Sequence, residues 1–147
     1  MLQVGLINQF LAENTIAVVG VSRDGDLPAN HIYKKLKENH YKVYPVNPNT
    51  GTVEGDKCYP SVDSLPNKPD AVMLASTPRV SEEVVTECIA SGIKNIWMHR
   101  GIGNGSYSEQ ATELCKRNGI EPITNGCPMM FVGKVDWFHR FFRWLKK

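Results

Sequence analysis

The 147 residues of the chain fit one domain, and a chain of this length can bury a hydrophobic core without disulfides or a structural metal. Its 41% hydrophobic and 22% charged residues are typical of a soluble globular protein, and a net charge of +2 is too small to indicate nucleic-acid binding. No segment approaches the roughly 18 consecutive apolar residues of a membrane span, and the first residues lack the basic and apolar regions of a secretory signal. We therefore expect a single cytoplasmic domain over residues 1–147, with neither a nucleic acid nor a membrane as partner.

The first part of the chain alternates helical and strand patterns. Apolar residues at helical spacing predict a short leading helix over 4–13. The continuous apolar run 16–21 predicts a strand that is buried on both faces, as in parallel sheets. A polar loop follows, and Asn30 is expected to cap a helix over 30–39. Residues 41–46 form the second expected strand.

The middle of the chain is less regular. Residues 50–69 are rich in Gly, Pro and Asp, which is typical of loops. We expect one short strand there, near Val53 or Cys58, and a helical turn over 62–65. Residues 71–75 are again continuously apolar and predict a third buried strand.

The pattern of strands and helices continues after this strand. A helix is expected over 80–91, with acidic residues in its first turn and Gly92 as its stop signal. A strand over 95–98 and a helix over 108–118 follow. A last short strand is expected over 120–123.

The regular alternation predicts the fold class. It indicates an α/β, Rossmann-like, doubly wound and mostly parallel sheet of about five strands, with helices on both faces. Ligands of such sheets bind beyond the carboxyl ends of the strands, near the point where the strand order reverses. Four polar loops should therefore meet at the site: residues 20–30, 47–49, 76–79 and 99–103.

The turn after the first strand carries the strongest signal for a nucleotide site. Gly20 allows a tight turn with close approach of the backbone to a ligand. Ser22 offers a hydroxyl, and the amides at the start of a following helix can hold a phosphate. Arg23 adds a charge that can pair with phosphate. We interpret this turn as a phosphate-binding site.

Two features argue against NAD as the ligand. The stretch from Gly20 to Gly25 lacks the second and third glycines of the GxGxxG pattern. The second strand ends in Val46, Asn47 and Pro48, without the acid that binds a ribose 2′-hydroxyl in NAD sites. A ligand with additional phosphate charge explains the missing acid better.

Several segments occur in the order typical of one family. They are residues 16–22, the pair Asn47-Pro48, residues 55–60, Ser76-Thr77-Pro78 and residues 96–101. Together they resemble the CoA-binding domain family, which is similar to the nucleotide-binding domain of the succinyl-CoA synthetase alpha subunit and of ADP-forming acyl-CoA synthetases. The resemblance covers residues 15–128, and it implies CoA or acyl-CoA as the cofactor.

The resemblance implies a role for each loop. The CoA diphosphate would be held by Gly20, Val21, Ser22 and Arg23. The adenosine and its 3′-phosphate would be bordered by Asn47, Pro48 and Asn49, with added charge from Lys57. The channel across the sheet would be lined by Ser76, Thr77 and Pro78, and the pantetheine end would lie toward Met98, His99, Arg100 and Gly101. We also count Asn30, at the expected helix start, among the cofactor-binding residues.

The resemblance also limits the function. The related synthetases pass a phosphoryl group through a histidine in a second domain and pair with a nucleotide-grasping domain. The sequence contains neither domain and no Walker loop. We expect a CoA-binding carrier, sensor or regulator without stand-alone ligase activity. Two other classes stay open: an NAD(P)-binding oxidoreductase or redox sensor, and an interaction subunit with a vestigial site.

Each cysteine, and also His99, can be interpreted either as a packed structural residue or as a residue that reacts with or contacts a ligand. Cys58, Cys88, Cys115 and Cys127 show no CxxC spacing and no matching histidines, so we expect no metal site, and the helical patterns place Cys88 and Cys115 on buried faces. Cys127 could form a mixed disulfide with CoA, although a packed residue before a turn is the simpler interpretation. No acid or nucleophile is visibly paired with His99, so we expect a ligand contact or a solvent-facing histidine rather than a catalytic base.

Two end segments complete the expected domain, a leading helix within residues 1–14 and an aromatic, basic helix over 135–147. In the tail, Trp137, Phe138, Phe141, Trp144 and Leu145 follow helical spacing. We expect this helix to cover the sheet. A homodimer contact is the second interpretation, and a membrane-surface helix is the third.

Overall fold

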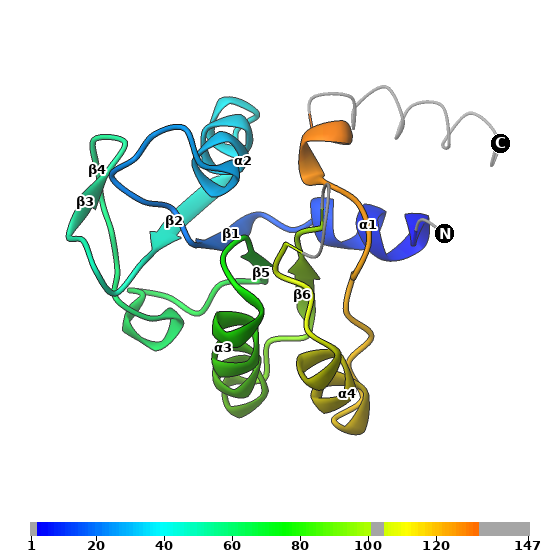
Figure 1. Cartoon of the computed structure of the whole chain (residues 1–147). Helices are drawn as coiled ribbons and strands as arrows, with labels where there is room; N and C mark the ends of the chain where they lie inside the picture. The colour runs from blue at the N-terminus through cyan, green and yellow to red at the C-terminus, as the bar shows by residue number, and fades with distance from the viewer. Residues whose placement is uncertain (1–2, 101–104, 133–147) are drawn as a thin grey trace, which may run out of the picture.

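The computed structural model describes residues 3–100 and 105–132. Its centre is a parallel sheet with the strand order β2-β1-β5-β6 (Figure 1). The strands are β1 (Thr15–Val19), β2 (Lys42–Val46), β5 (Ala71–Leu74) and β6 (Asn95–Met98). The helices are α1 (Val4–Leu11), α2 (Pro28–Glu38), α3 (Pro78–Ser91) and α4 (Glu109–Arg117). This arrangement confirms the predicted Rossmann-like α/β class, and the strand order reverses between β1 and β5.

Helices cover both faces of the sheet. α1 and α2 lie on one face, and α3 and α4 lie on the other (Figure 1). Alternate residues of β1 supply the two cores: Ile16 and Val18 belong to the first, and Ala17 and Val19 belong to the second. Each of the four is at most 3% exposed. Burial on both faces explains why the strand is continuously apolar.

Within the described residues the parallel sheet has four strands rather than about five. In place of the last expected strand, Ile123 makes a single parallel bridge with Trp97. Its amide donates to the Ile96 carbonyl, and its carbonyl accepts from the Met98 amide. The carbonyl of the preceding residue, Pro122, accepts from Gln3 Nε2 at 3.0 Å rather than from β6. The order of elements was therefore predicted correctly, but the length of this pairing was not.

Two helices begin earlier than expected, each at a proline. Proline is favoured at the first helical position, because its fixed φ suits the helix and its missing N–H is not needed there. α2 begins at Pro28 after Leu27, so the expectation that Asn30 caps this helix was wrong. α3 begins at Pro78, and the Thr77 hydroxyl caps it by accepting from the Val80 amide at 3.3 Å. Its first turn therefore contains no acidic residue, whereas the left-handed Gly92 ends it as predicted.

The irregular middle segment holds a hairpin rather than one short strand. β3 (Thr52–Val53) pairs antiparallel with β4 (Asp56–Lys57). Glu54 and Gly55 form the two-residue turn with positive φ values of 50° and 78°, as this kind of hairpin requires. The expected helical turn is the 3-10 helix η1 (Val62–Ser64), and a second one, η2 (Pro128–Met130), follows the Trp97–Ile123 bridge.

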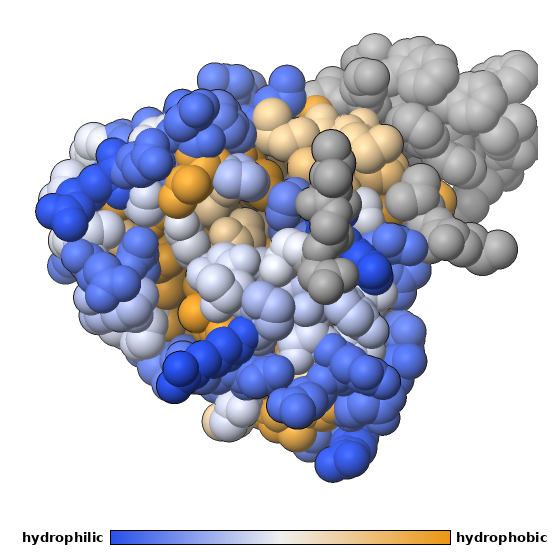
Figure 2. Space-filling view, in the orientation of Figure 1, coloured by the Kyte–Doolittle hydropathy of each residue, from blue (hydrophilic) through white to orange (hydrophobic). Residues whose placement is uncertain are grey.

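The remaining predictions concern burial and the chain end. Cys88 and Cys115 are fully buried, as expected. Across residues 3–100 and 105–132, no helix is both long and apolar enough to cross a membrane. Figure 2 shows that hydrophilic residues make up most of the surface in view, with hydrophobic residues in patches between them. The expected tail helix over 135–147 lies outside the described residues.

Candidate functional site

A pocket of about 320 Å³ lies at the carboxyl ends of β1 and β2, beside the end of β5. It therefore lies at the point where the strand order reverses, which is where open parallel sheets bind ligands. Seven residues from three of the predicted loops line it: Gly20, Ser22, Leu27, Asn47, Pro48, Asn49 and Ser76. The structure thus brings these three loops together around one hollow.

At Gly20 the backbone that follows β1 passes very close to the backbone that follows β5. Its amide donates to the Val46 carbonyl at 2.9 Å, which extends the ladder between β1 and β2. Its φ is +111°, and a Cβ at this position would lie 2.5 Å from the carbonyl oxygen of Ala75. Both facts require glycine, because a side chain would collide with the backbone directly after β5. The tight turn predicted from the sequence is therefore present.

The side chain of Asn30 fixes the turn after β1 by hydrogen bonds to the backbone of Ser22. Its Oδ1 accepts from the Ser22 amide at 3.1 Å, and its Nδ2 donates to the Ser22 carbonyl at 2.8 Å and to Glu54 Oε1 at 2.9 Å. The side chain is fully buried and does not line the pocket. In this structure Asn30 shapes the loop, and a contact with the cofactor stays a prediction. Since α2 begins only at Pro28, its N-terminal amides do not directly follow the turn.

Asn47 joins the second loop to the first. Its Nδ2 donates to the Val21 carbonyl at 3.0 Å, and its Oδ1 accepts from the Asn49 amide at 2.8 Å. The second bond makes a local turn that a following proline tolerates. Pro48 and Asn49 are exposed at the rim of the pocket. The loop is therefore fixed at its base and accessible to a ligand at its tip.

The N-terminus of α3 forms part of another wall. Ser76, directly before the cap residue Thr77, and Val80, in the first turn of the helix, both line the pocket. The helix dipole places partial positive charge at this N-terminus, which favours an anionic ligand, although Pro78 has no amide hydrogen and the Val80 amide donates to Thr77. The position of α3 therefore supplies the phosphate-attracting terminus that the sequence suggested for the helix after the first strand.

Two carboxylates from α3 face the same pocket. Glu83 and Glu87 line it together with Val80 and Val84, at the i, i+3, i+4 and i+7 positions of one helix face. The Glu87 carboxylate accepts from the Val62 amide at 3.2 Å. Burial raises the pKa of Glu87, and the nearby Asp63 charge raises it further. This part of the wall opposes phosphate, so the anionic part of a ligand fits best at the Gly20 and Ser76 end.

Several predicted contact residues lie away from this pocket. Val21 and Met98 are fully buried in the core, and Arg23, Thr77 and Pro78 are exposed beside the pocket without lining it. Lys57 lies 5.1 Å from the ring centroid of Tyr59, in the groove that Tyr59 and Tyr33 line. Arg100 lies 4.7 Å from the ring centroid of Tyr107, and Gly101 is outside the described residues. These residues remain predictions as ligand contacts.

His99, at the end of β6, has a partner that the sequence did not reveal. Its Nε2 lies 3.3 Å from Sγ of Cys127, which is 28 residues away in the chain. His99 is 9% exposed, and burial lowers the pKa of its imidazole. The expectation that no nucleophile is paired with His99 was therefore wrong, because the topology brings Cys127 back to the end of β6.

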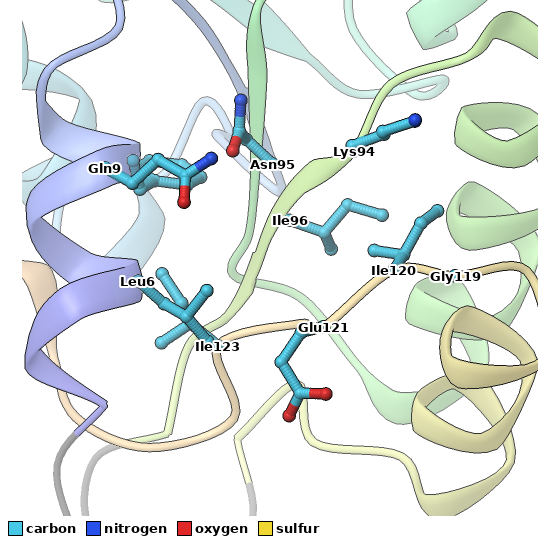
Figure 3. A pocket seen from close by; sticks show the side chains of 10 residues that line it. Leu6, Gln9, Lys94, Asn95, Ile96, Gly119, Ile120, Glu121 and Ile123 are labelled. Atoms are coloured by element: carbon cyan, nitrogen blue, oxygen red, sulfur yellow. The ribbon is translucent and has the colours of Figure 1, made fainter.

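A second hollow, of about 210 Å³, lies at a different place (Figure 3). Figure 3 shows Leu6 and Gln9 of α1 on one side, Asn95 and Ile96 of β6 in the middle, and Ile120 on the far side. Asn95 begins β6, whereas the predicted ligand loops follow the ends of the strands. This hollow is therefore separate from the candidate nucleotide site.

Comparison with known proteins identifies the family. Residues 14–132 match the sequence profile of a family described as a CoA binding domain. The chain belongs to the CoA-binding domain family. This finding confirms the resemblance that residues 16–22 and the later segments indicate.

The relatives of this CoA-binding domain protein differ in length. An ADP-forming acetate–CoA ligase of Archaeoglobus fulgidus is 33% identical over 123 residues, which are 76% of this chain but 18% of the ligase. The YneT protein of Bacillus subtilis is 26% identical over 112 residues, and these cover 80% of YneT. A solved structure from Pyrococcus horikoshii, described as a hypothetical protein, is 32% identical with a TM-score of 0.79, over 88% of this chain and 89% of that one. The chain thus spans less than a fifth of the ligase and most of the two short relatives.

Some residues of this CoA-binding domain were missed at the sequence level. The face of α3 that carries Glu83 and Glu87 was read only as a helix, although its i, i+3, i+4 and i+7 spacing marks one surface. Ser106 was also missed: it is fully buried, its Oγ accepts from the Ser76 amide at 2.7 Å, and its own amide donates to the His99 carbonyl at 2.8 Å. No local sequence signal identifies this serine, because its partners are brought near by the fold.

Proposed function

We propose that this protein binds CoA or an acyl-CoA in the pocket beside Gly20 and acts as a carrier, sensor or regulator. The observation that carries the proposal is the glycine crossing at the switch point of the strand order, where a Cβ would meet the Ala75 carbonyl at 2.5 Å. Backbone and ligand can approach closely at such a crossing. Membership of the CoA-binding domain family supports CoA as the ligand.

The polarity of the pocket supports one orientation of the cofactor. The diphosphate would lie near Gly20, Ser22 and Ser76, because the N-terminus of α3 begins there. The adenosine would lie toward Asn47 and the exposed side chain of Leu27, which lines the pocket and is 40% exposed. In this orientation the diphosphate lies toward Gly20 and Ser76 rather than toward the Glu87 carboxylate.

The lengths of the relatives support a binding role rather than a ligase role. The two short relatives have little chain beyond the matched region, whereas the ligase is more than five times as long as the match. We infer that the function of this chain rests on binding and presenting the cofactor.

Calorimetric titration of the full chain with CoA, acetyl-CoA, NAD and NADP tests the proposal. We expect saturable binding of CoA or acetyl-CoA at one site per chain. At a hundredfold excess over the dissociation constant, such binding stabilises the fold by about 2.7 kcal/mol, which a thermal shift detects. Binding of NAD or NADP without binding of either CoA compound would replace the proposal with the oxidoreductase alternative.

A pair of arginine variants locates the phosphates. Arg23→Gln removes an exposed charge next to Ser22, and Arg117→Gln removes an arginine at the end of α4. If Arg23 reaches the diphosphate, its loss weakens CoA binding about tenfold, since a hydrogen bond to a charged group contributes about 1.5 kcal/mol or more. Equal affinities of the two variants would show that the diphosphate lies elsewhere.

A further inference from the structure

The pair of Cys127 and His99 has the composition of a nucleophile with its base. The Nε2 to Sγ distance of 3.3 Å is within hydrogen-bonding reach for sulfur. His99 is nine-tenths buried, whereas Cys127 is partly exposed. Burial lowers the pKa of His99, so the imidazole is neutral near pH 7 and able to accept a proton. An accessible thiol beside a buried base is the arrangement that activates a cysteine.

The position of Cys127 is fixed by the residue before it. The Gly126 carbonyl accepts from the indole Nε1 of Trp97 at 3.3 Å and from the Arg100 amide at 3.4 Å. Trp97 is fully buried and stacks edge-on against Phe10, with 5.4 Å between the ring centroids. The Cys127 carbonyl in turn accepts from the Met130 amide at 3.0 Å. The thiol is therefore held at the end of β6 by the core of the protein.

The other cysteines of the chain are not equivalent to Cys127. Cys58, Cys88 and Cys115 are at most 4% exposed. Burial raises the pKa of Cys88 to about 12 and that of Cys115 to about 11, and it also raises the pKa of Cys58. These thiols stay protonated and inaccessible, which leaves Cys127 as the reactive cysteine of the chain.

The pair lies within reach of a cofactor bound at Gly20. Val19, Leu74 and Met98 are paired in register across β1, β5 and β6, so the next residues, Gly20 and His99, lie level at the ends of their strands. Two strand spacings separate them, about 10 Å. The long, flexible pantetheine arm of CoA can span this distance and bring its sulfur to Cys127.

We propose that Cys127, with His99 as its base, exchanges with disulfides of CoA and thereby holds CoA as a mixed disulfide. His99 accepts the proton of the Cys127 thiol. The Cys127 sulfur then attacks the CoA sulfur of the incoming disulfide, the old S–S bond breaks, and a Cys127–CoA disulfide forms. The leaving thiolate takes the proton from His99. One disulfide is consumed and one is formed, so no further oxidant is needed.

Disulfide exchange requires few chemical groups at the site. It requires a thiol that solvent can reach and a proton acceptor beside it, and the partly exposed Cys127 and the neighbouring His99 supply these. Attack on an acyl-CoA thioester would in addition require hydrogen-bond donors for the oxyanion that forms on the carbonyl. We therefore propose disulfide exchange, which needs fewer groups at the site, rather than acyl transfer.

Intact-mass measurement of the reduced full chain after incubation with CoA disulfide tests the proposal. We expect the mass of one CoA to be added per chain, one free CoA to be released, and a reducing thiol to reverse both. Cys127→Ser should abolish the adduct, and Cys58→Ser, the matched control, should leave it unchanged. His99→Gln should slow the exchange by about a hundredfold, the usual contribution of a general base.

The proposed disulfide exchange rests on the proposed CoA binding, and separate measurements test the two. Titration with reduced CoA reports the binding site alone, and thermal unfolding shows that Cys127→Ser and His99→Gln remain folded. Normal CoA binding without an adduct, or an adduct that persists in Cys127→Ser, would overturn the exchange and leave the proposed function intact. Glutathione disulfide should react more slowly than CoA disulfide; equal rates would show that the pocket does not guide the reaction.

Discussion

The hydroxyl of Ser106 makes two hydrogen bonds with the backbone of Ser76. Its Oγ accepts from the Ser76 amide at 2.7 Å and donates to the Ser76 carbonyl at 3.1 Å. The Ser106 carbonyl also accepts from the Ser81 hydroxyl at 2.6 Å, and its amide donates to the His99 carbonyl. One buried serine thus ties together the pocket wall at the end of β5, the helix α3 and the end of β6.

Ser106→Ala should weaken both the fold and the site. The substitution leaves the Ser76 amide without its partner and removes the link between the pocket and β6. We expect the free energy of unfolding to fall by about 1–3 kcal/mol, as for other amides that lose a partner, and CoA affinity to fall with it. Ser91→Ala is the matched control, because its hydroxyl bonds only the exposed side chain of Asp63 at 3.2 Å. Urea unfolding and CoA titration of both variants provide the comparison; equal stabilities would contradict this role of Ser106.

Gly20→Ala should disrupt the turn. The new Cβ would lie 2.5 Å from the Ala75 carbonyl oxygen, at a φ of +111° that other residues rarely adopt. The end of β5 must then shift, at a cost of about 1–3 kcal/mol for the strained conformation, and CoA binding should be lost. Gly51→Ala is the control, since nothing lies within 4 Å of its added Cβ. Thermal unfolding and CoA titration measure both effects, and unchanged CoA affinity in Gly20→Ala would place the ligand elsewhere.

The order of elements could be predicted from local patterns, but their exact ends could not. Continuous apolar runs identify the strands of a doubly buried sheet, as the burial of Ile16 to Val19 illustrates. The starts of α2 and α3 were missed because Pro28 and Pro78 were read as loop residues, although proline suits the first helical position. The fifth strand was overpredicted, because the apolar residues Ile120 and Ile123 suggest a strand, whereas only Ile123 pairs with β6, in one bridge to Trp97.

The candidate site could be predicted only where its residues follow the strands. Gly20, Asn47 and Ser76 come directly or closely after strands, so the topology rule identifies them. The pairing of His99 with Cys127 depends on how the chain returns to β6 after α4, and sequence spacing carries no such information. Side-chain direction was also beyond the sequence: Asn30 points back to Ser22 rather than into the pocket.

A carboxylate on the hairpin should make the fold less stable in acid. Asp56 Oδ2 accepts from Lys37 at 2.6 Å and from the Tyr33 hydroxyl at 2.5 Å. These two bonds, with Lys37 first, hold the pKa of Asp56 below its usual value of 3.8. Because the folded state favours the ionised form, this contribution is present above pH 3.8 and is lost as the pH falls through the folded-state pKa.

Tyr33→Phe isolates that contribution. We expect the variant to be less stable than the parent by about 1 kcal/mol at neutral pH, because one hydrogen bond to a partly exposed charge is lost. The difference should shrink as the pH falls below 3.8 and through the folded-state pKa of Asp56, where the carboxyl becomes protonated. Tyr44→Phe, which removes a hydroxyl not bonded to Asp56, is the control. Denaturant unfolding at several pH values measures the effect, and a difference that stays constant into acid would exclude Asp56 as its source.

Glu87 should show the opposite dependence on pH. Burial, followed by the Asp63 charge, raises the pKa of Glu87 above its usual value of 4.5. The folded state therefore disfavours the ionised form, and stability is lost as the pH rises from 4.5 through the folded-state pKa. Glu87→Gln keeps an oxygen for the Val62 amide and removes the charge. We expect it to raise the melting temperature at pH 7 but not below pH 4.5.

The same substitution should tighten binding of CoA. Glu87 lines the pocket, and its negative charge repels the phosphates of the ligand. We expect an increase in affinity of a few fold at pH 7, because the two charges interact across a partly solvated pocket. Glu83→Gln is the matched control, one turn earlier on the same wall of the pocket, with a side chain that is 64% exposed and better screened. Calorimetric titration of both variants at low and moderate salt separates the effects, and weaker binding by Glu87→Gln would instead indicate that the carboxylate contacts the ligand directly.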